Sequence, residues 1–411
     1  MGDPQTMKVF SPASPLRPTH PPQRWLTRGV LGIGLASLFS DWGHEAATAI
    51  LPAFLASLGA PAFALGVIEG VSDGLSSFAK LAGGWIADRP KLRKPTGIIG
   101  YFATGLSTFA YAFAQSWPAI LLMRALGWVG RGSRGPSRDT LLADCAAPDQ
   151  QGRAFGFERA MDTIGAVLGP LCATALLGTL GARGVLRWTL LPGLAAGLAF
   201  AYLAPKGIPD DGHRAPSFAS SFARLPRMYW HYLAGVFAHG IGDFAPTLLI
   251  LRAGQILTPH YGFARASAIA VALYTFYNFV DAAASYPAGA LADRIDKRGL
   301  LAVGYLFAVV AFAGFILEPP TIPVLGILFG LAGIHGAVQQ SVEKSLAAEL
   351  LPAANRGSGF GVLATVNGVG DLISSVAVGA LWSSVSPNAG FIYAGGFTLL
   401  GAVLLYSYTG R

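Results

Sequence analysis

The segment Gly84-Trp-Ile-Ala-Asp88-Arg89 recurs as Gly289-Ala-Leu-Ala-Asp293-Arg294, with an offset of 205 residues between the two aspartates. A second pair of similar segments, Arg153-Ala-Phe-Gly156 and Arg356-Gly-Ser-Gly359, has an offset of 203 residues. Both offsets are close to half of the 411 residues. The sequence therefore predicts two halves of the same construction.

The composition indicates that these halves lie in a membrane. Hydrophobic residues make up 53% of the chain and charged residues only 12%, against about 25% charge in soluble domains. Apolar stretches reach the roughly 20 residues that cross a bilayer as a helix, which disfavours a β-barrel with its strands of about 10 residues. We predict an all-α membrane protein with twelve transmembrane helices in two parallel six-helix halves. The predicted spans are 28–58, 64–87, 96–115, 117–146, 152–180, 184–204, 229–253, 264–291, 299–317, 321–350, 356–384 and 387–409.

Lysine and arginine residues set the expected orientation. With the N-terminus inside, eighteen of the 29 cationic residues fall on the cytoplasmic side and four on the other, as the positive-inside rule requires. We predict a disordered cytoplasmic tail over 1–27, a first half over 28–204, a cytoplasmic linker over 205–228 and a second half over 229–411. Topology thus explains the net charge of +8, and no nucleic-acid partner is expected.

The predicted spans of the first half carry many charges, although each costs about 2.5 kcal/mol or more at mid-bilayer. Asp41 and Glu45 are four residues apart and share one helical face, and Glu69 and Asp73 repeat this spacing. The charged residues of these spans are nearly balanced, which predicts pairing across a cavity. They are the acids Asp41, Glu45, Glu69, Asp73, Asp139, Glu158 and Asp162 and the bases Lys80, Arg124, Arg131, Arg134, Arg138 and Arg159. As proton-coupling carboxylates we predict Asp41, Glu45, Glu69, Asp73 and Asp162.

Polar groups along both halves are candidates for contacting a substrate. Arg131 and Arg134 belong to one basic stripe, which either binds an anionic group or neutralises the acids of the first two spans. In the second half, Glu343 and Lys344 are expected to pair with each other near the inner surface. The predicted substrate-binding residues are Arg131, Arg134, Asp243, Tyr274, Asn278 and Gln339.

Parallel six-span halves describe one class of secondary transporter, and the motifs resemble those of the major facilitator superfamily. The loop Gly84-Trp-Ile-Ala-Asp88-Arg89-Pro-Lys91-Leu-Arg93-Lys94 is similar to its signature loop, and Gly165-Ala-Val-Leu-Gly169-Pro170 resembles a motif of proton-coupled drug antiporters. The resemblance implies a bacterial cytoplasmic (inner) membrane location and a gating set. That set is Asp88, Arg89, Arg124, Gly165, Gly169, Pro170, Asp293 and Arg294.

The expected function is alternating-access transport of a small molecule, with proton-coupled efflux favoured by the resemblance. Uptake or export of an anionic metabolite, siderophore or metal chelate is the alternative, and Na⁺ is an alternative coupling ion. No catalytic or nucleotide-binding motif appears, so no enzyme is expected. Cys145 and Cys172 lack metal-ligand spacing, and we predict no metal site and no cofactor other than the coupling ion. The expected partners are the substrate and the lipid bilayer, with the protein as a monomer.

Overall fold

The structure is a computed structural model that describes residues 25–60, 62–205, 223–317 and 321–407. These residues form helices and no strands. The first half contains α1 (Arg28–Ser57), α2 (Ala62–Ala87), α3 (Pro90–Ala110), α4 (Trp117–Cys145), α5 (Gln151–Trp188) and α6 (Leu190–Leu203). The second half contains α8 (Arg227–Gly240), α9 (Thr247–Tyr261), α10 (Phe263–Ala292), α11 (Lys297–Ile316), α12 (Ile322–Leu350), α13 (Arg356–Ser384) and α14 (Pro387–Ser407). Nearly all of the predicted tail and residues 206–222 of the predicted linker lie outside the described residues.

The helices make twelve spans, which confirms the predicted fold class. Within the described residues, five helical stretches are long and apolar enough to cross a membrane by length and composition alone. They are Pro148–Leu203, Lys297–Ile316, Ile322–Leu350, Ala353–Trp382 and Pro387–Ser407. Helices such as α4, which contains Arg131, Arg134 and Arg138, owe their lower hydropathy to charged side chains.

One predicted span is interrupted in the structure. Residues 229–253 were predicted as one span, but α8 ends at Gly240 and α9 begins at Thr247. Pro246 lies in this break and cannot donate the backbone hydrogen bond that would continue a helix. A second break lies between the predicted fifth span, which ends at 180, and the predicted sixth span, which begins at 184: the φ of 65° and ψ of 171° of Gly181 are not helical. Glycine tolerates this positive φ because it has no Cβ.

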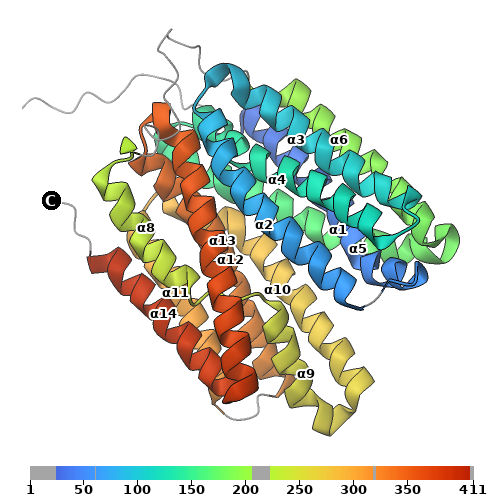
Figure 1. Ribbon diagram of the computed structural model, residues 1–411. Helices are drawn as coiled ribbons and strands as arrows, with labels where there is room; N and C mark the ends of the chain where they lie inside the picture. The colour runs from blue at the N-terminus through green and yellow to red at the C-terminus, as the bar shows by residue number, and fades with distance from the viewer. Residues whose placement is uncertain (1–24, 61, 206–222, 318–320, 408–411) are drawn as a thin grey trace, which may run out of the picture.

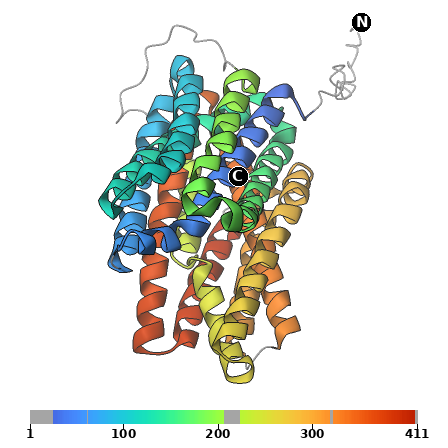
Figure 2. The ribbon, with the colours of Figure 1, turned by 90° about the vertical axis from the view of Figure 1, so that its right-hand side faces the viewer.

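The N-terminus of α1 and the C-terminus of α14 lie at the same end of the molecule, which we call the inner end. The opposite end is the outer end. The buried core at the inner end is shared, because one cluster contains Val30 and Phe155 of the first half together with Tyr229 and Phe360 of the second. Toward the outer end the described residues form two separate clusters, each from one half. The halves accordingly lie together at the inner end and diverge toward the outer end (Figure 1). Figure 2 shows the same helices side-on, running roughly parallel to the long axis.

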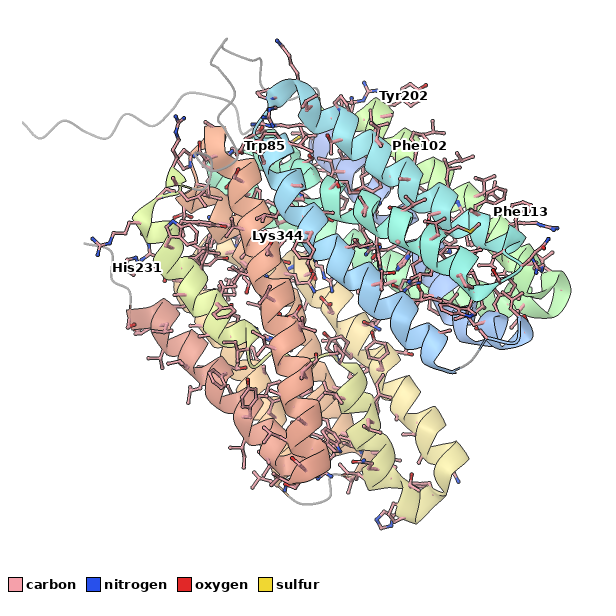
Figure 3. All side chains as sticks on the ribbon, in the orientation of Figure 1. Trp85, Phe102, Phe113, Tyr202, His231 and Lys344 are labelled. Carbon is pink, nitrogen blue, oxygen red and sulfur yellow. The ribbon has the colours of Figure 1, made fainter. Side chains whose placement is uncertain are left out.

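Large apolar side chains cover the outside of the bundle. Phe113 and Tyr202 are 55% and 73% exposed, and both lie at the periphery of the first half (Figure 3). Phe78, at 79%, and Ile99, at 68%, are similarly exposed. A soluble monomer rarely exposes continuous apolar surface, so this surface fits contact with lipid.

Candidate substrate cavity and gate

The repeated sequence motifs meet crosswise at the inner end. A Cβ on Gly84 of α2 would lie 2.7 Å from the carbonyl oxygen of Gly357 in α13, and a Cβ on Gly289 of α10 would overlap the carbonyl oxygen of Gly152 in α5. Only glycine allows backbones to approach this closely. Each half thus contributes one motif glycine and one helix start to the closed inner end.

A carboxylate follows each of these glycines and caps the opposite half. Asp88, in the turn after α2, accepts hydrogen bonds from the backbone N–H (3.0 Å) and the hydroxyl group of Ser358 near the start of α13. Asp293, in the turn after α10, accepts from the backbone N–H groups of Gly152 (2.7 Å) and Arg153 (3.0 Å) at the start of α5. A helix N-terminus attracts negative charge. We call these two contacts the Asp88 latch and the Asp293 latch.

The residues beside the latches differ in their contacts. Arg89 stacks over the Trp85 ring at 3.5 Å, and Arg294 lies beside Trp25 and Tyr286 on a surface hollow between the halves.

Burial raises the pKa of Asp88 to about 6, although its hydrogen bonds to Ser358 lower the pKa in part. The pKa of Asp293 is raised for the same reason.

A further ion-pair network at the inner end was not predicted from the sequence. Asp144 of α4 contacts Arg93 of α3 at 2.8 Å and Arg356 of α13 at 3.0 Å, and it thereby ties the halves together. Its neighbours along the chain are apolar and uncharged, so the only available signal was its place at the end of a span.

Behind the closed inner end lies a cavity of about 380 Å³ between the halves, within the range of small-molecule sites. Residues of α2, α4, α5, α12 and α13 and of the break between α8 and α9 line the cavity. Its ionisable lining residues are six bases and six acids. They are Lys80, Arg131, Arg134, Arg138, Arg159 and Lys344 and Asp139, Glu158, Asp162, Asp243, Glu343 and Asp371.

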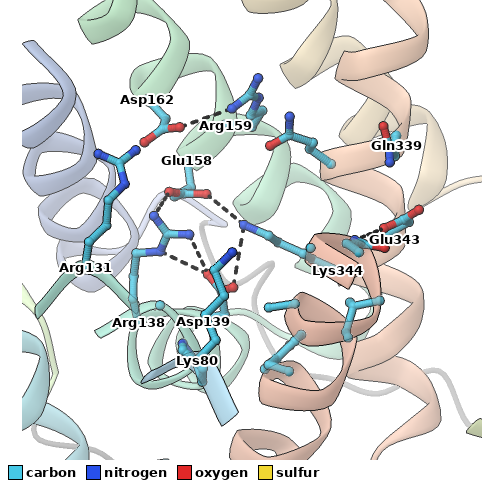
Figure 4. Close-up of a pocket in the computed structure, with 18 of the residues that line it drawn as sticks. Lys80, Arg131, Arg138, Asp139, Glu158, Arg159, Asp162, Gln339, Glu343 and Lys344 are labelled. Atoms are coloured by element: carbon cyan, nitrogen blue, oxygen red, sulfur yellow. Dashed lines mark hydrogen bonds and ion pairs between the residues drawn. The ribbon is translucent and has the colours of Figure 1, made fainter. Parts of the chain in front are cut away.

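Lys344 joins the second half to the acids of the first half. Its Nζ lies 3.5 Å from Asp139 and 3.8 Å from Glu158, and Arg138 contacts the same two acids at 2.9 and 2.7 Å (Figure 4). The predicted pairing of Glu343 with Lys344 is therefore wrong. Adjacent residues on a helix point about 100° apart, and Glu343 instead accepts hydrogen bonds from Tyr305 (2.6 Å) and from Asn367.

Arg159 of α5 makes the second ionic contact between the halves across the cavity. Its guanidinium lies 2.6 Å from Asp281 of α10 and 3.1 Å from Asp162 on its own helix. Asp281 is fully buried and also accepts a hydrogen bond from Ser285. Among the described residues Arg159 is the cation at ion-pair distance from Asp281, so separation of α5 from α10 would remove this compensation.

The five predicted proton-coupling carboxylates have different surroundings. Asp41 is buried and pairs with Arg131 at 2.9 Å, while Glu45 remains one-third exposed, 3.9 Å from His44. Asp162 lines the cavity. The side chains of Glu69 and Asp73 lie outside the described residues.

Four of the predicted substrate-binding residues line the cavity, namely Arg131, Arg134, Asp243 and Gln339. Arg134 donates to the hydroxyl groups of Thr104 and Ser40 at 2.9 and 2.7 Å, and within the described residues no carboxylate lies at ion-pair distance from it. The other two, Tyr274 and Asn278, are half-buried in α10 and are not among the lining residues.

The remaining predicted gating residues lie away from the latches. A Cβ on Gly165 or Gly169 would clash with the backbone of α1, so this face of α5 packs on α1 and not on α10. Pro170 follows Gly169 inside the same helix. Arg124 is buried near the outer end of α4, with its guanidinium 5.3 Å from the Trp128 ring.

Comparisons with known proteins agree with this architecture. A family model described as Major Facilitator Superfamily matches residues 33–321 and 249–411. The uncharacterized MFS-type transporter MJ1317 of Methanocaldococcus jannaschii is 28% identical over 389 residues, which cover 93% of this chain and 95% of that protein. The quinolone resistance protein NorA of Staphylococcus aureus is 30% identical over 122 residues, 29% of this chain and 31% of its own.

Among solved structures, a bacterial homologue of the iron transporter ferroportin in its outward-facing state has a TM-score of 0.74 at 15% identity. The match covers 93% of this chain and 99% of that one. At this level of identity the likeness concerns the fold alone.

Proposed function

The chain belongs to the Major Facilitator Superfamily, and from this premise we propose that it is a proton-coupled exporter of a small polar or charged organic molecule. The observation that carries the proposal is the set of buried ion pairs that cross the cavity from one half to the other. These pairs involve Arg159 with Asp281 and Lys344 with Asp139 and Glu158. Rocking of the halves must separate each pair.

Separation of a buried pair provides a physical route to proton coupling. A carboxylate that loses its cationic partner in a low-dielectric site gains proton affinity, and one that regains the partner loses it. Asp162 of the first half and Asp281 of the second half pair with the same cation, Arg159, so movement of the halves changes how its charge is shared. Asp41 pairs with Arg131, which lines the same cavity. Protonation of these carboxylates then alternates with the state of the halves, which couples proton movement to substrate movement.

Export is supported by the partial likeness to NorA, whose name refers to quinolone resistance. That likeness covers 29% of the chain, and measurement of accumulation in cells tests the direction of transport. The cavity fits a molecule with polar groups, because twelve ionisable side chains line it.

An anionic substrate is the second candidate, and Arg134 favours it. The Arg134 guanidinium lines the cavity and is bonded only to neutral hydroxyl groups among the described residues. A bound carboxylate or phosphate group would compensate its charge. Arg131 already pairs with Asp41, so Arg134 is the stronger anion-binding candidate of the two.

An accumulation screen tests the proposal. Cells lacking the protein and cells overproducing it are compared over drugs, anionic metabolites, metals and chelators, and overproduction is expected to lower the accumulation of at least one compound. Asp41→Asn and Asp162→Asn should reduce that export about tenfold or more, equivalent to ~1.4 kcal/mol. Glu349→Gln is the matched control, because Glu349 is 58% exposed at the inner end and should leave export unchanged.

The screen also separates the two candidates. If the compound found is anionic, Arg134→Ala should abolish its transport. If it is neutral or cationic, the same variant should leave most transport intact. Unchanged accumulation of every compound, or full export by both carboxylate variants, would contradict the proposal.

A further inference from the structure

We propose that His239, Asp243 and His335 form a binding site for a divalent transition-metal ion at the break between α8 and α9. The site goes beyond the proposed export function, because its three ligands belong to the second half alone. It requires neither proton coupling nor a particular direction of transport. No metal site is predicted from the sequence, since the two histidines are 96 residues apart.

The three side chains converge on one point. The Nε2 atom of His239 lies 3.6 Å from Oδ2 of Asp243, and the Nε2 atom of His335 lies 3.9 Å from Oδ1. The candidate ligand atoms all lie within 4.8 Å of one another. These separations are too long for hydrogen bonds, yet a small inward movement of the side chains would bring all three onto one ion with bonds of about 2.0–2.2 Å.

Both histidines are buried with unused nitrogen atoms. His239 is fully buried, and within the described residues neither of its ring nitrogens has a hydrogen-bond partner. His335 is 6% exposed, and its Nε2 atom lacks a hydrogen-bond partner in the same way. Buried polar atoms without partners are costly, and a metal ion bound by the two Nε2 atoms would satisfy one ring nitrogen of each histidine.

The hydrogen bond of the Nδ1 atom of His335 determines whether its Nε2 atom faces Asp243 as a donor or as an acceptor. Its Nδ1 atom lies 3.1 Å from the carbonyl oxygen of Gly304, which can only accept, so Nδ1 carries the proton. In the neutral ring Nε2 then presents a lone pair toward the carboxylate of Asp243. Two acceptors that face each other require a cation between them.

The surrounding groups hold the ligands as those around known metal sites do. A metal-binding histidine usually donates its other N–H to a carbonyl or carboxylate, as His335 does to Gly304. Gln339 donates to Oδ2 of Asp243 at 3.0 Å and orients the carboxylate. The ring of His239 stacks on Tyr305 with centroids 3.7 Å apart.

Asp243 lies close to His239 along the chain. It follows the end of α8 by three residues, in the turn before α9, and it follows His239 by four residues, the spacing of one helical turn. The C-terminal end of α8 also contributes negative potential. Because Asp243 and Gln339 line the central cavity, an ion can reach the site from there.

The donor set selects the class of ion. Two imidazole nitrogens and one carboxylate suit Zn²⁺, Co²⁺, Ni²⁺ or Fe²⁺, whereas Mg²⁺ and Ca²⁺ prefer oxygen ligands. Discrimination against Mg²⁺ is therefore part of the proposal.

Direct metal binding to the full-length protein in detergent, with any affinity tag removed, tests the site. Co²⁺ is titrated by its ligand-field absorption and Zn²⁺ by calorimetry. We expect one ion per chain and no competition from excess Mg²⁺. Asp243→Asn, which preserves the side-chain shape, and His335→Ala should each weaken binding by about 100-fold or more, and Gln339→Leu should weaken it by about tenfold.

His44→Ala is the matched control, because His44 is a buried histidine of α1 outside the site and should leave metal binding unchanged. Monodisperse elution of each variant shows that it is folded. Absence of Co²⁺ and Zn²⁺ binding to the wild type would overturn the proposal and would indicate that a proton bridges His335 and Asp243. Equal binding by wild type, Asp243→Asn and Gln339→Leu would also overturn it. Neither result would affect the export proposal, which rests on the ion pairs that cross the cavity.

Discussion

The two walls of the cavity compensate their buried acids in different ways. In the first half, Asp41 and Glu158 each lie within 3 Å of an arginine. In the second half, Glu343 accepts hydrogen bonds from a tyrosine and an asparagine, and Asp243 faces two histidines and Gln339. The buried acids of the first half are thus compensated by cations, whereas those of the second half are surrounded mainly by neutral hydrogen-bonding groups.

This difference indicates where movement changes the electrostatics most. Removal of one partner from a buried ion pair leaves an uncompensated charge, whereas neutral hydrogen bonds contribute little net free energy. Arg159, like Lys344, links the two walls, because it pairs with Asp162 on one and Asp281 on the other. The comparison predicts that variants at ionic contacts have large effects and variants at neutral contacts small ones.

The largest expected effect is that of Arg159→Met. The variant leaves Asp281, which is fully buried, without its cation, and the free energy of unfolding should fall by about 3–5 kcal/mol. Thermal unfolding in detergent measures the loss. The double variant Arg159→Met/Asp281→Asn removes both charges of this pair and should recover the part of the loss that is due to Asp281.

Glu343→Gln is the variant to compare with Arg159→Met, because Glu343 is bonded to neutral side chains and not to a cation. It replaces a buried carboxylate that is bonded to Tyr305 and Asn367, and its effect should stay within about 1 kcal/mol. A loss as large as that of Arg159→Met would mean that the two walls do not differ as described.

A smaller effect concerns pH and the latches at the inner end. The pKa of Asp88 is about 6 in the latched state and near 3.9 when exposed, so the latched state binds more protons and is favoured as pH falls. When the pH is lowered from 7.5 to 5, the equilibrium between the unlatched and latched states should shift about tenfold toward the latched state, or ~1.4 kcal/mol. Electron-spin distance measurements between labels at the exposed positions Leu92 and Ile295 follow this closure.

Asp88→Asn should lose most of the pH response, and further substitution of Asp293 should remove the rest, because the pKa of Asp293 is raised in the same direction. A pH response that persists undiminished in the double variant would place the titrating groups elsewhere.

Most of the fold follows from local sequence. Apolar runs and flanking charges predict helix ends to within a few residues, as for 356–384 and α13. The break in the seventh span was missed because the apolar run continues through it, although Gly242 and Pro246 mark the place. The repeat predicts equivalent halves, but the crosswise meeting of Gly84 with Gly357 depends on how the halves dock.

The candidate site was harder to predict than the fold, because its ion pairs join residues that are far apart in the sequence. Helical spacing places Asp41 and Glu45 on one face, but nothing local indicates that Arg131 reaches Asp41 or that Lys344 reaches Asp139 from the other half. Likewise His239 and Asp243 are close in sequence, whereas His335 joins them only through packing of α12.

Simultaneous recording of solute and proton movement in proteoliposomes tests whether this protein couples transport to protons. Vesicles with purified protein and a lumenal pH dye receive a gradient of the compound identified by accumulation. The account predicts that downhill solute movement drives protons in the opposite direction and that Asp162→Asn abolishes this proton movement. Solute transport at an unchanged lumenal pH would contradict it.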